Sequence, residues 1–166
     1  MFSTIAELWR NRRSGPAGPF EAGVAAIEAG RYREAVHLLT RALHESGRDA
    51  AVVAAILNKR GVALVHREER DQALADFRAA LDSDPKCTAA IVNLGNLALE
   101  DGEVERAIEQ YQAALRIDAE CALAHHNLGA AYRQLGRRSE SVQHLRAAEK
   151  IRSRTWFVRL RDRPLR

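Results

Sequence analysis

The residues best suited to chemistry in this sequence are six histidines and two cysteines. Zinc sites usually place histidines and cysteines at short, regular spacings, and zinc proteases carry His-Glu-x-x-His on one helix. The histidines follow neither pattern, and the neighbours His125 and His126 would point in different directions on a helix. We therefore expect structural or surface-lining roles for them, and we predict neither a metal nor another cofactor.

Other catalytic groups are equally hard to assemble. No serine or cysteine has a candidate base nearby in the sequence, and no glycine-rich loop resembles a phosphate cradle. Acidic pairs such as Glu68 and Glu69 fall where we expect exposed turns. We therefore expect these carboxylates to be solvated. The sequence predicts a protein that is not an enzyme and has no small-molecule substrate.

The two cysteines, Cys87 and Cys121, lie 34 residues apart. Equivalent points on stacked helices are roughly 8–10 Å apart, which exceeds the Cα separation of about 7 Å that a disulfide tolerates. We expect two small, half-buried, reduced thiols. Their spacing also equals the period of the whole sequence.

That period begins with the glycines Gly23, Gly61, Gly95 and Gly129, which are separated by 38, 34 and 34 residues. Similar residues then recur at fixed distances after each glycine. Seven residues later stand Gly30, Glu68, Gly102 and Gly136; twelve later Ala35, Ala73, Ala107 and Ser141; sixteen later Leu39, Phe77, Tyr111 and Leu145; and nineteen later Ala42, Ala80, Ala114 and Ala148. Four copies of one structural unit are indicated.

These residue types suit an antiparallel pair of helices. Small residues in the middle of each helix let the partner helix approach closely, and the large residue at the sixteenth position fills the space between the alanines. The glycine at the seventh position ends the first helix, because it adopts the left-handed cap conformation without strain. Asp84 and Pro85 separate one copy from the next.

The interval of 38 residues places four extra residues near Asp49–Val53. Either the loop there is longer, or the next helix begins one turn early. We favour the early start, because the run Ala50–Leu57 is too apolar for an exposed loop.

The sequence resembles the tetratricopeptide repeat family. The likeness rests on Asn93-Leu94-Gly95, on Asn127-Leu128-Gly129-Ala130-Ala131-Tyr132 and on the segment 107–115, and it covers residues 16–150. It implies an all-α, right-handed superhelical solenoid of about four antiparallel helix pairs. The expected repeats are residues 16–49, 54–87, 88–121 and 122–150, flanked by an N-terminal segment, 1–15, and a C-terminal tail, 151–166.

The resemblance also implies a concave groove lined by the first helix of each pair. The groove positions would be Val24, Ile27, Asn58, Val62, Val65, Val92, Asn93, Asn96, Leu99, His126, Asn127, Ala130 and Arg133. This lining is apolar with spaced amides, which suits an apolar peptide or helix of a partner protein. The alternative is that some of these side chains belong to the core, and the sequence does not separate the two for any single valine.

One subtype of the family grips a terminal carboxylate with lysines, asparagines and an arginine on successive first helices. Over the last three pairs the matching positions read Asn58, Val62, Asn93, Leu123 and Asn127, of which only Asn93 fits. We therefore expect an apolar segment as the ligand, not a terminal carboxylate.

The two ends carry features that the repeats do not explain. Phe2, Ile5 and Trp9 share one face of a short N-terminal helix that could cap the first repeat, bind a partner subunit or lie on a membrane interface. The last repeat helix is expected to end at about Ser153. Beyond it, the aromatic residues alternate with arginines at Trp156, Phe157, Arg159 and Arg161.

For this C-terminal tail, docking on a protein is favoured, for example on a multisubunit complex. Nucleic acid and an anionic membrane surface are the alternative partners. The simplest alternative is a solvated tail that binds nothing. Residues 146–166 sum to +6 and residues 16–145 to −4, so that the tail would meet an anionic partner.

No apolar run approaches the roughly 20 residues that span a bilayer, and the N-terminus lacks the features of a secretory signal. We expect a cytoplasmic protein, at most peripheral to a membrane or large complex. The excess of arginine over lysine, 23 against 3, is typical of a GC-rich genome and suggests a bacterial source.

Overall fold

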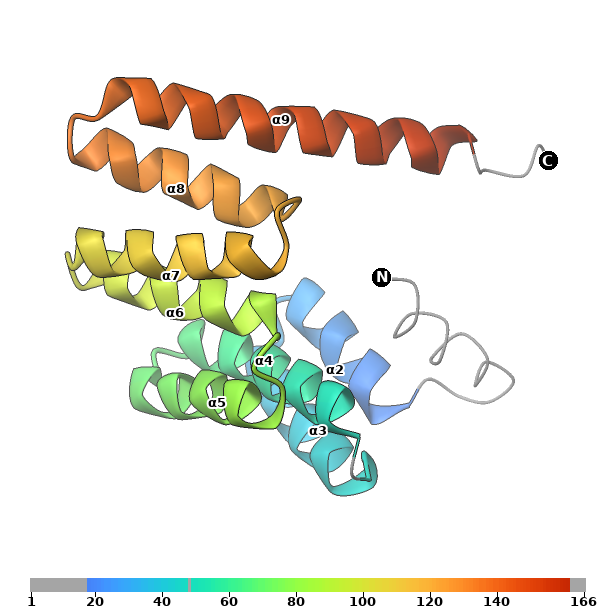
Figure 1. Ribbon diagram of the computed structural model, residues 1–166. Helices are drawn as coiled ribbons and strands as arrows, with labels where there is room; N and C mark the ends of the chain where they lie inside the picture. Colours follow the sequence, from blue (N-terminus) through green and yellow to red (C-terminus); the bar gives the residue numbers. More distant parts are fainter. Residues whose placement is uncertain (1–17, 48, 162–166) are drawn as a thin grey trace. The chain divides into compact units, whose positions relative to one another are not determined.

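The chain folds into consecutive helices in a computed structural model that describes residues 18–47 and 49–161. Within these ranges there are eight helices and no strands, which confirms the predicted all-α repeat fold (Figure 1). The helices are α2 (Pro19–Glu28), α3 (Tyr32–Glu45), α4 (Ala50–Val65), α5 (Arg70–Ser83), α6 (Thr88–Glu100), α7 (Val104–Ile117), α8 (Ala122–Gln134) and α9 (Arg138–Arg161). The N-terminal segment with Phe2, Ile5 and Trp9 lies outside the described residues.

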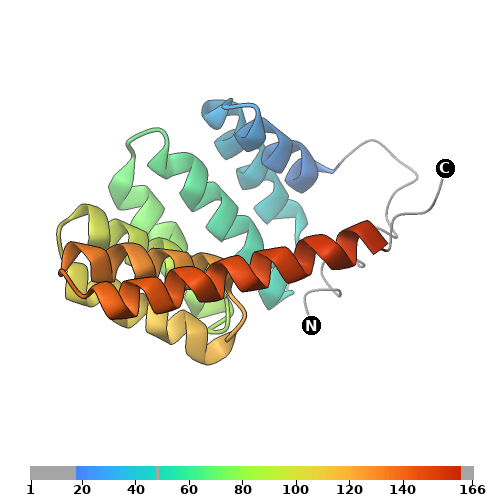
Figure 2. The ribbon, with the colours of Figure 1, turned by 90° about the horizontal axis from the view of Figure 1, so that it is seen from above.

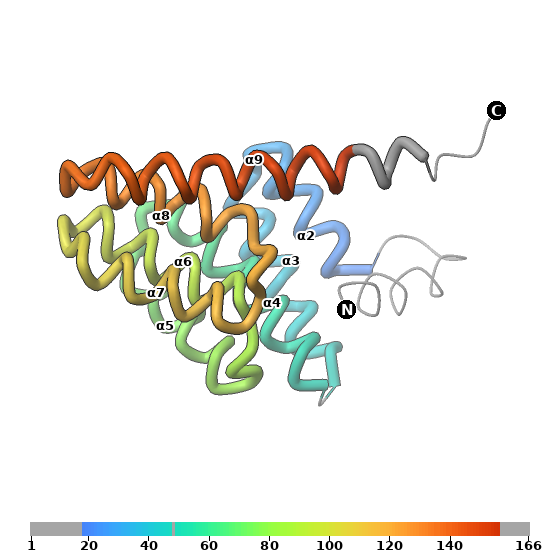
Figure 3. The backbone as a smooth tube through the Cα atoms, turned by 45° about the horizontal axis from the view of Figure 1, so that its top comes forward, coloured from blue at the N-terminus to red at the C-terminus, as the bar shows by residue number. Residues whose placement is uncertain are grey.

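The helices pack in pairs, and the chain divides into two compact units between Cys87 and Thr88. The first unit holds the pairs α2–α3 and α4–α5, and the second holds α6–α7 and α8–α9. Figure 3 follows the chain through these four pairs. In each unit the first helices of the two pairs also touch, α2 with α4 and α6 with α8. These four first helices carry the candidate groove residues.

Each pair is held together where its repeat glycine meets the large residue sixteen positions later. A Cβ atom placed on Gly61 would lie 2.6 Å from the Phe77 ring, and one on Gly95 would lie 2.6 Å from the Tyr111 ring. The sequence predicted close approach at these glycines, but it placed the large residue between the alanines and not on the glycine itself. The predicted alanines are buried, and Ser141, which replaces one of them, donates to the Gly129 carbonyl at 2.7 Å.

The first helix of every pair ends in the predicted left-handed conformation. Gly102, for example, has a φ of 78°, and the amide of Glu103 donates back to the carbonyl of Ala98 at 2.9 Å. The second pair has no glycine here, yet Glu68 adopts the same conformation with a φ of 63°. The cap is therefore imposed by the repeat, at a steric cost where the residue has a Cβ atom.

Helix α4 confirms the predicted early start, because it begins at Ala50. Asp49 caps it: its Oδ1 accepts from the amides of Ala51 at 3.0 Å and Val52 at 3.2 Å. Such side-chain caps satisfy amides that have no partner within the helix.

Helix α9 contradicts the predicted end at Ser153, because it continues without a break to Arg161 (Figure 2). The physical reason is that no glycine or proline interrupts residues 138–161, and Pro164 is the next residue that would stop a helix. Pairs one turn apart also support the extension, such as Arg152 with Glu149. Residues 151–161 of the predicted tail are therefore helical, although the side chains of Phe157, Arg159 and Arg161 lie outside the described part.

Both cysteines are half-buried thiols, as predicted. No helix in the described part of the chain is long and apolar enough to cross a membrane.

Candidate functional site

The predicted groove residues all lie on the first helix of a pair. Val24 and Ile27 are on α2, Asn58, Val62 and Val65 on α4, Val92, Asn93, Asn96 and Leu99 on α6, and His126, Asn127, Ala130 and Arg133 on α8. Most of these side chains are half-buried, while His126 and Arg133 are exposed. Asn58 and Val92 are only 7% and 1% exposed, so the prediction that they line a surface is wrong. At these positions on α4 and α6, the two side chains lie in the packed interior.

In the first unit, the candidate positions that remain form an apolar set. Val24 lies on α2, and Val62 and Val65 lie on the neighbouring α4. All three are half-buried, so part of each apolar side chain faces solvent. Ile27 packs against the core cluster that includes Leu39, which makes it partly a core residue. This set can contact an apolar ligand but offers no side-chain amide.

In the second unit, two predicted residues are joined directly. The Oδ1 atom of Asn96 on α6 accepts a hydrogen bond from Asn127 Nδ2 on α8 at 2.7 Å. The same oxygen accepts a bond from the Tyr111 hydroxyl on α7 at 2.8 Å. These three residues, the Asn–Tyr–Asn cluster, tie three helices together and orient both amide groups.

Tyr111 is the buried member of this cluster, and its hydroxyl is a hydrogen-bond donor. Burial of its phenol, reinforced by the negative charge of Glu100, raises the pKa of Tyr111 to about 12. The hydroxyl therefore stays protonated at neutral pH and donates to Asn96.

The Asn–Tyr–Asn cluster leaves hydrogen-bonding capacity unused. Among the described residues, no hydrogen bond engages Asn96 Nδ2 or Asn127 Oδ1. One group donates and the other accepts, as do the amide and carbonyl of an extended peptide. The half-buried Leu99 and Ala130 lie about one turn further along α6 and α8. The arrangement can hold a peptide backbone beside apolar side chains.

Two histidines form a second cluster on the α8–α9 pair that sequence reasoning missed. His125 Nδ1 and His144 Nδ1 are 2.9 Å apart, so one of the two nitrogens carries the proton. The His144 ring also stacks on Tyr132, with ring centres 5.5 Å apart, and the Arg137 guanidinium covers the Tyr132 ring. Burial, together with His125, lowers the pKa of His144. The pair packs two helices, and the lowered pKa favours the neutral form of His144.

A buried ion pair in the first unit was also missed. Arg60 Nε and Nη2 donate to the two carboxylate oxygens of Asp76 at 2.7 and 2.6 Å, and Nη1 donates to Thr40 Oγ1 at 3.1 Å. The network joins α3, α4 and α5. Its members lie 16 and 20 residues apart and share no motif, so only the helix register brings them together.

Neither cluster supplies the groups of a metal centre. Within the described ranges, no three histidine, cysteine, aspartate or glutamate side chains gather where they could hold a metal ion.

Comparison with protein families relates the sequence to helical repeats. Two models described as tetratricopeptide repeat match residues 20–86 and 122–155, and a third, described as TPR repeat, matches residues 95–136. Together they cover most of the chain. A comparison with curated proteins finds no match.

Solved structures show the same fold at low sequence identity. A crystal structure of MamA is 22% identical with a TM-score of 0.65, covering 82% of this chain and 78% of that one. MamA from Desulfovibrio magneticus RS-1, residue 41 to the end, is 21% identical with a TM-score of 0.63, over 87% and 79% of the two chains. YrrB, described as a TPR protein with an unusual peptide-binding site, is 23% identical with a TM-score of 0.59, over 80% and 66%.

Proposed function

Because the chain belongs to the tetratricopeptide repeat family, we propose that it is a non-catalytic adaptor, scaffold or assembly factor. Its ligand is an apolar peptide or helix of a partner protein. In the second unit the ligand lies along α6 and α8, over Asn96, Leu99, Asn127 and Ala130. The Asn–Tyr–Asn cluster is the single observation that carries this proposal.

The cluster supports a peptide ligand because its free groups match a peptide backbone in chemistry. Asn96 Nδ2 can donate to a backbone carbonyl, and Asn127 Oδ1 can accept from a backbone amide. Their positions are set by the bonds to Tyr111 and to each other, at 2.8 and 2.7 Å. Groups that are oriented in advance lose less conformational entropy when the ligand binds. The peptide-binding site ascribed to the structurally similar YrrB is consistent with this use of the fold.

Apolar side chains would supply the rest of the affinity. Leu99 and Ala130 flank the amides in the second unit, and Val24, Val62 and Val65 form the apolar set of the first unit. Each is half-buried, so a ligand can still remove apolar surface from water, which contributes about 25 cal/mol for each Å². This pattern favours a ligand whose apolar side chains alternate with a bonded backbone.

The experiment that tests this function selects ligands from a random peptide library displayed on phage, using the full-length protein as bait. Selected peptides are expected to be rich in apolar residues. Asn96→Ala and Leu99→Glu are each expected to weaken their binding at least 10-fold, which is about 1.4 kcal/mol. Glu109→Ala, at an exposed position of α7, is the matched control. Failure to select any peptide, or equal binding by all variants with unchanged melting temperatures, would reject the proposal.

An alternative function uses the basic end of the chain to reach nucleic acid or an anionic membrane. This alternative is favoured by four exposed cations that lie close together on the helix α9: Arg146, Lys150, Arg152 and Arg154. It predicts binding that falls steeply with salt. If deletion of residues 150–166, which removes Lys150, Arg152 and Arg154, leaves the binding of RNA, DNA and anionic vesicles unchanged, this alternative is excluded.

A further inference from the structure

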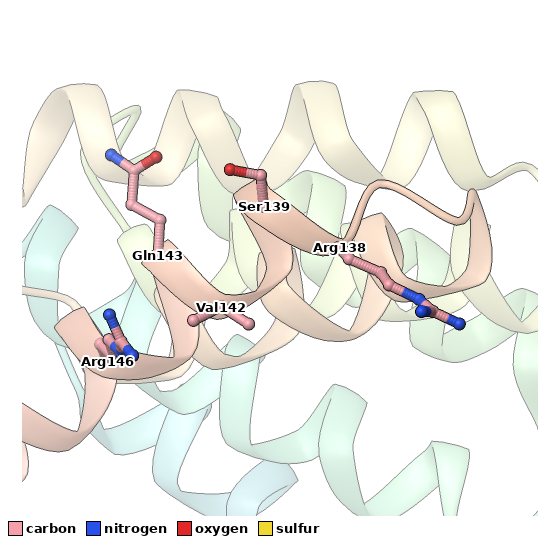
Figure 4. Close-up of a pocket in the computed structure, with 5 residues that line it drawn as sticks. All are labelled: Arg138, Ser139, Val142, Gln143 and Arg146. Atoms are coloured by element: carbon pink, nitrogen blue, oxygen red, sulfur yellow. The ribbon is translucent and has the colours of Figure 1, made fainter.

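One face of α9 has no helix packed on it within the described part of the chain. Ser141, His144 and Leu145 contact α8. With about 100° of rotation per residue, Ser139, Gln143 and Arg146 lie on the opposite side of α9, and Arg138 and Val142 lie between that side and the contact with α8. These five exposed side chains line a shallow depression (Figure 4): Arg138, Ser139, Val142, Gln143 and Arg146. We call these five residues the Arg–Val–Arg face.

The centre of the Arg–Val–Arg face is apolar and its ends are cationic. Val142 is 45% exposed, although α9 as a whole is polar. Arg138 lies four residues before it and Arg146 four residues after it, which places the two Cα atoms about 12 Å apart along the helix. Figure 4 shows Val142 between the two arginines. An apolar contact and two charged contacts are thus spaced along one line.

The two arginines differ from several nearby cations whose charges are matched by acidic side chains. Arg137, which precedes α9, pairs with Glu140, and on α9 Arg152 pairs with Glu149 and Arg154 with Glu120. Neither Arg138 nor Arg146 makes an ion pair with a described residue. Their guanidinium groups can therefore form two-bond contacts with carboxylates of another molecule without breaking a described bond.

We propose that the Arg–Val–Arg face docks an acidic amphipathic segment of a partner protein. One apolar side chain of that segment rests on Val142, and carboxylates on either side of it bind Arg138 and Arg146. Ser139 and Gln143 accept or donate further hydrogen bonds at the edge. This site lies on α9, whereas the proposed peptide site lies on α6 and α8, so either can be lost without the other.

Charge and shape select this partner over two others. A second copy of the chain, related by a two-fold axis through this face, would bring four arginines together, which opposes association. A membrane interface requires a broad apolar face on the helix, whereas Val142 is the one apolar residue among the five that line the depression.

The test uses the full-length protein and an array of synthetic 15-residue peptides. Each peptide carries a central leucine with glutamates three or four residues to either side, and matched arrays carry glutamine or lysine instead. We expect the glutamate peptides to bind at least 10-fold more tightly than the lysine peptides. The double variant R138E/R146E is expected to bind the glutamate peptides at least 10-fold more weakly. The single variant Val142→Ser is expected to bind them about 3-fold more weakly.

The matched control is R106E/R116E, which makes the same change of net charge at exposed positions of α7. Equal loss in both double variants would show general electrostatic attraction and overturn the proposal, as would the absence of saturable binding to any glutamate peptide. The proposal also fails if R138E/R146E instead removes binding to vesicles of phosphatidylcholine and phosphatidylserine. It fails equally if this variant abolishes self-association in sedimentation equilibrium.

Discussion

Asp76 is a buried carboxylate, 6% exposed, whose two oxygens both bind Arg60. The bond to Asp76 raises the pKa of Arg60, so the guanidinium stays charged. A buried pair of this kind adds little stability over an apolar pair, but removing one member leaves the other unpaired. Such a pair specifies how α4 and α5 pack.

Asp76→Ala is therefore expected to lower the free energy of unfolding by about 2–3 kcal/mol, since Arg60 keeps some contact with solvent. The double variant with Arg60→Met should recover part of that loss, because no unpaired charge remains. Urea unfolding followed by circular dichroism measures both. A loss below about 0.5 kcal/mol in Asp76→Ala would contradict this account.

Glu68 is the one described non-glycine residue with a positive φ. The other three repeats place a glycine at the equivalent position, where a side chain would meet no neighbour within 4 Å, as at Gly102. The cost at Glu68 is therefore backbone strain and not crowding.

Glu68→Gly is expected to raise the free energy of unfolding by about 1 kcal/mol, because glycine adopts the left-handed conformation without strain. Gly102→Ala should lower it by about the same amount. Thermal and urea unfolding of the two variants check the prediction. A destabilised Glu68→Gly variant would show that contacts of the Glu68 side chain outweigh the strain.

At the scale of helix pairs, Gly95 controls how closely α6 approaches the Tyr111 ring on α7. An added Cβ atom would stand 2.6 Å from Cε1 of Tyr111, which the packed pair cannot accept without a shift. The shift would also move the Tyr111 hydroxyl away from Asn96. The glycine thus serves both the fold and the proposed site.

Gly95→Ala is expected to destabilise the protein by about 2 kcal/mol and to weaken peptide binding together with it. Ala89→Ser, at an exposed position of the same helix, is the control for both measurements. If Gly95→Ala retained full stability and full peptide affinity, the proposed role of this close contact would be wrong.

The α8–α9 pair is expected to depend on pH through His144. Its pKa is lowered in the folded protein below the usual value of 6.5, so the unfolded chain binds more protons as the pH falls through that value. Stability should therefore decrease as the pH falls from about 7 to 5.

His144→Gln should reduce this pH dependence, because glutamine does not titrate and can still bond His125. Urea midpoints at pH 8, 6.5 and 5 measure the effect in both proteins. An unchanged pH dependence in His144→Gln would exclude His144 as its source.

The four helix pairs could be predicted from the sequence, because the residues that pack each pair, glycines, alanines and one large side chain, recur at fixed spacing. The early start of α4 followed in the same way from the apolar run that begins at Ala50. The Arg60–Asp76 and His125–His144 pairs could not be predicted, since they depend on the rotation of neighbouring helices. The burial of Asn58 and Val92 depends on the same rotation. The end of α9 was misjudged because a missing stop signal is harder to recognise than a present one.

At the scale of the whole molecule, charge and apolar surface are distributed unevenly. Residues 16–145 sum to −4, whereas residues 146–166 sum to +6, and the continuous helix α9 carries the first part of this positive segment. The proposed peptide site on α6 and α8 is neutral, and the Arg–Val–Arg face on α9 is cationic. A chain with two sites of different chemistry can hold two different segments, as a scaffold requires.

The central claim is that a peptide binds along α6 and α8 through Asn96 and Asn127. The most direct test records amide chemical shifts by NMR while a phage-selected apolar peptide is added to the full-length protein. The account predicts saturable shifts of the side-chain amides of Asn96 and Asn127 and of the Leu99 and Ala130 backbone, with small changes at Glu109. Shifts confined to α9, or none at saturating peptide, would contradict it.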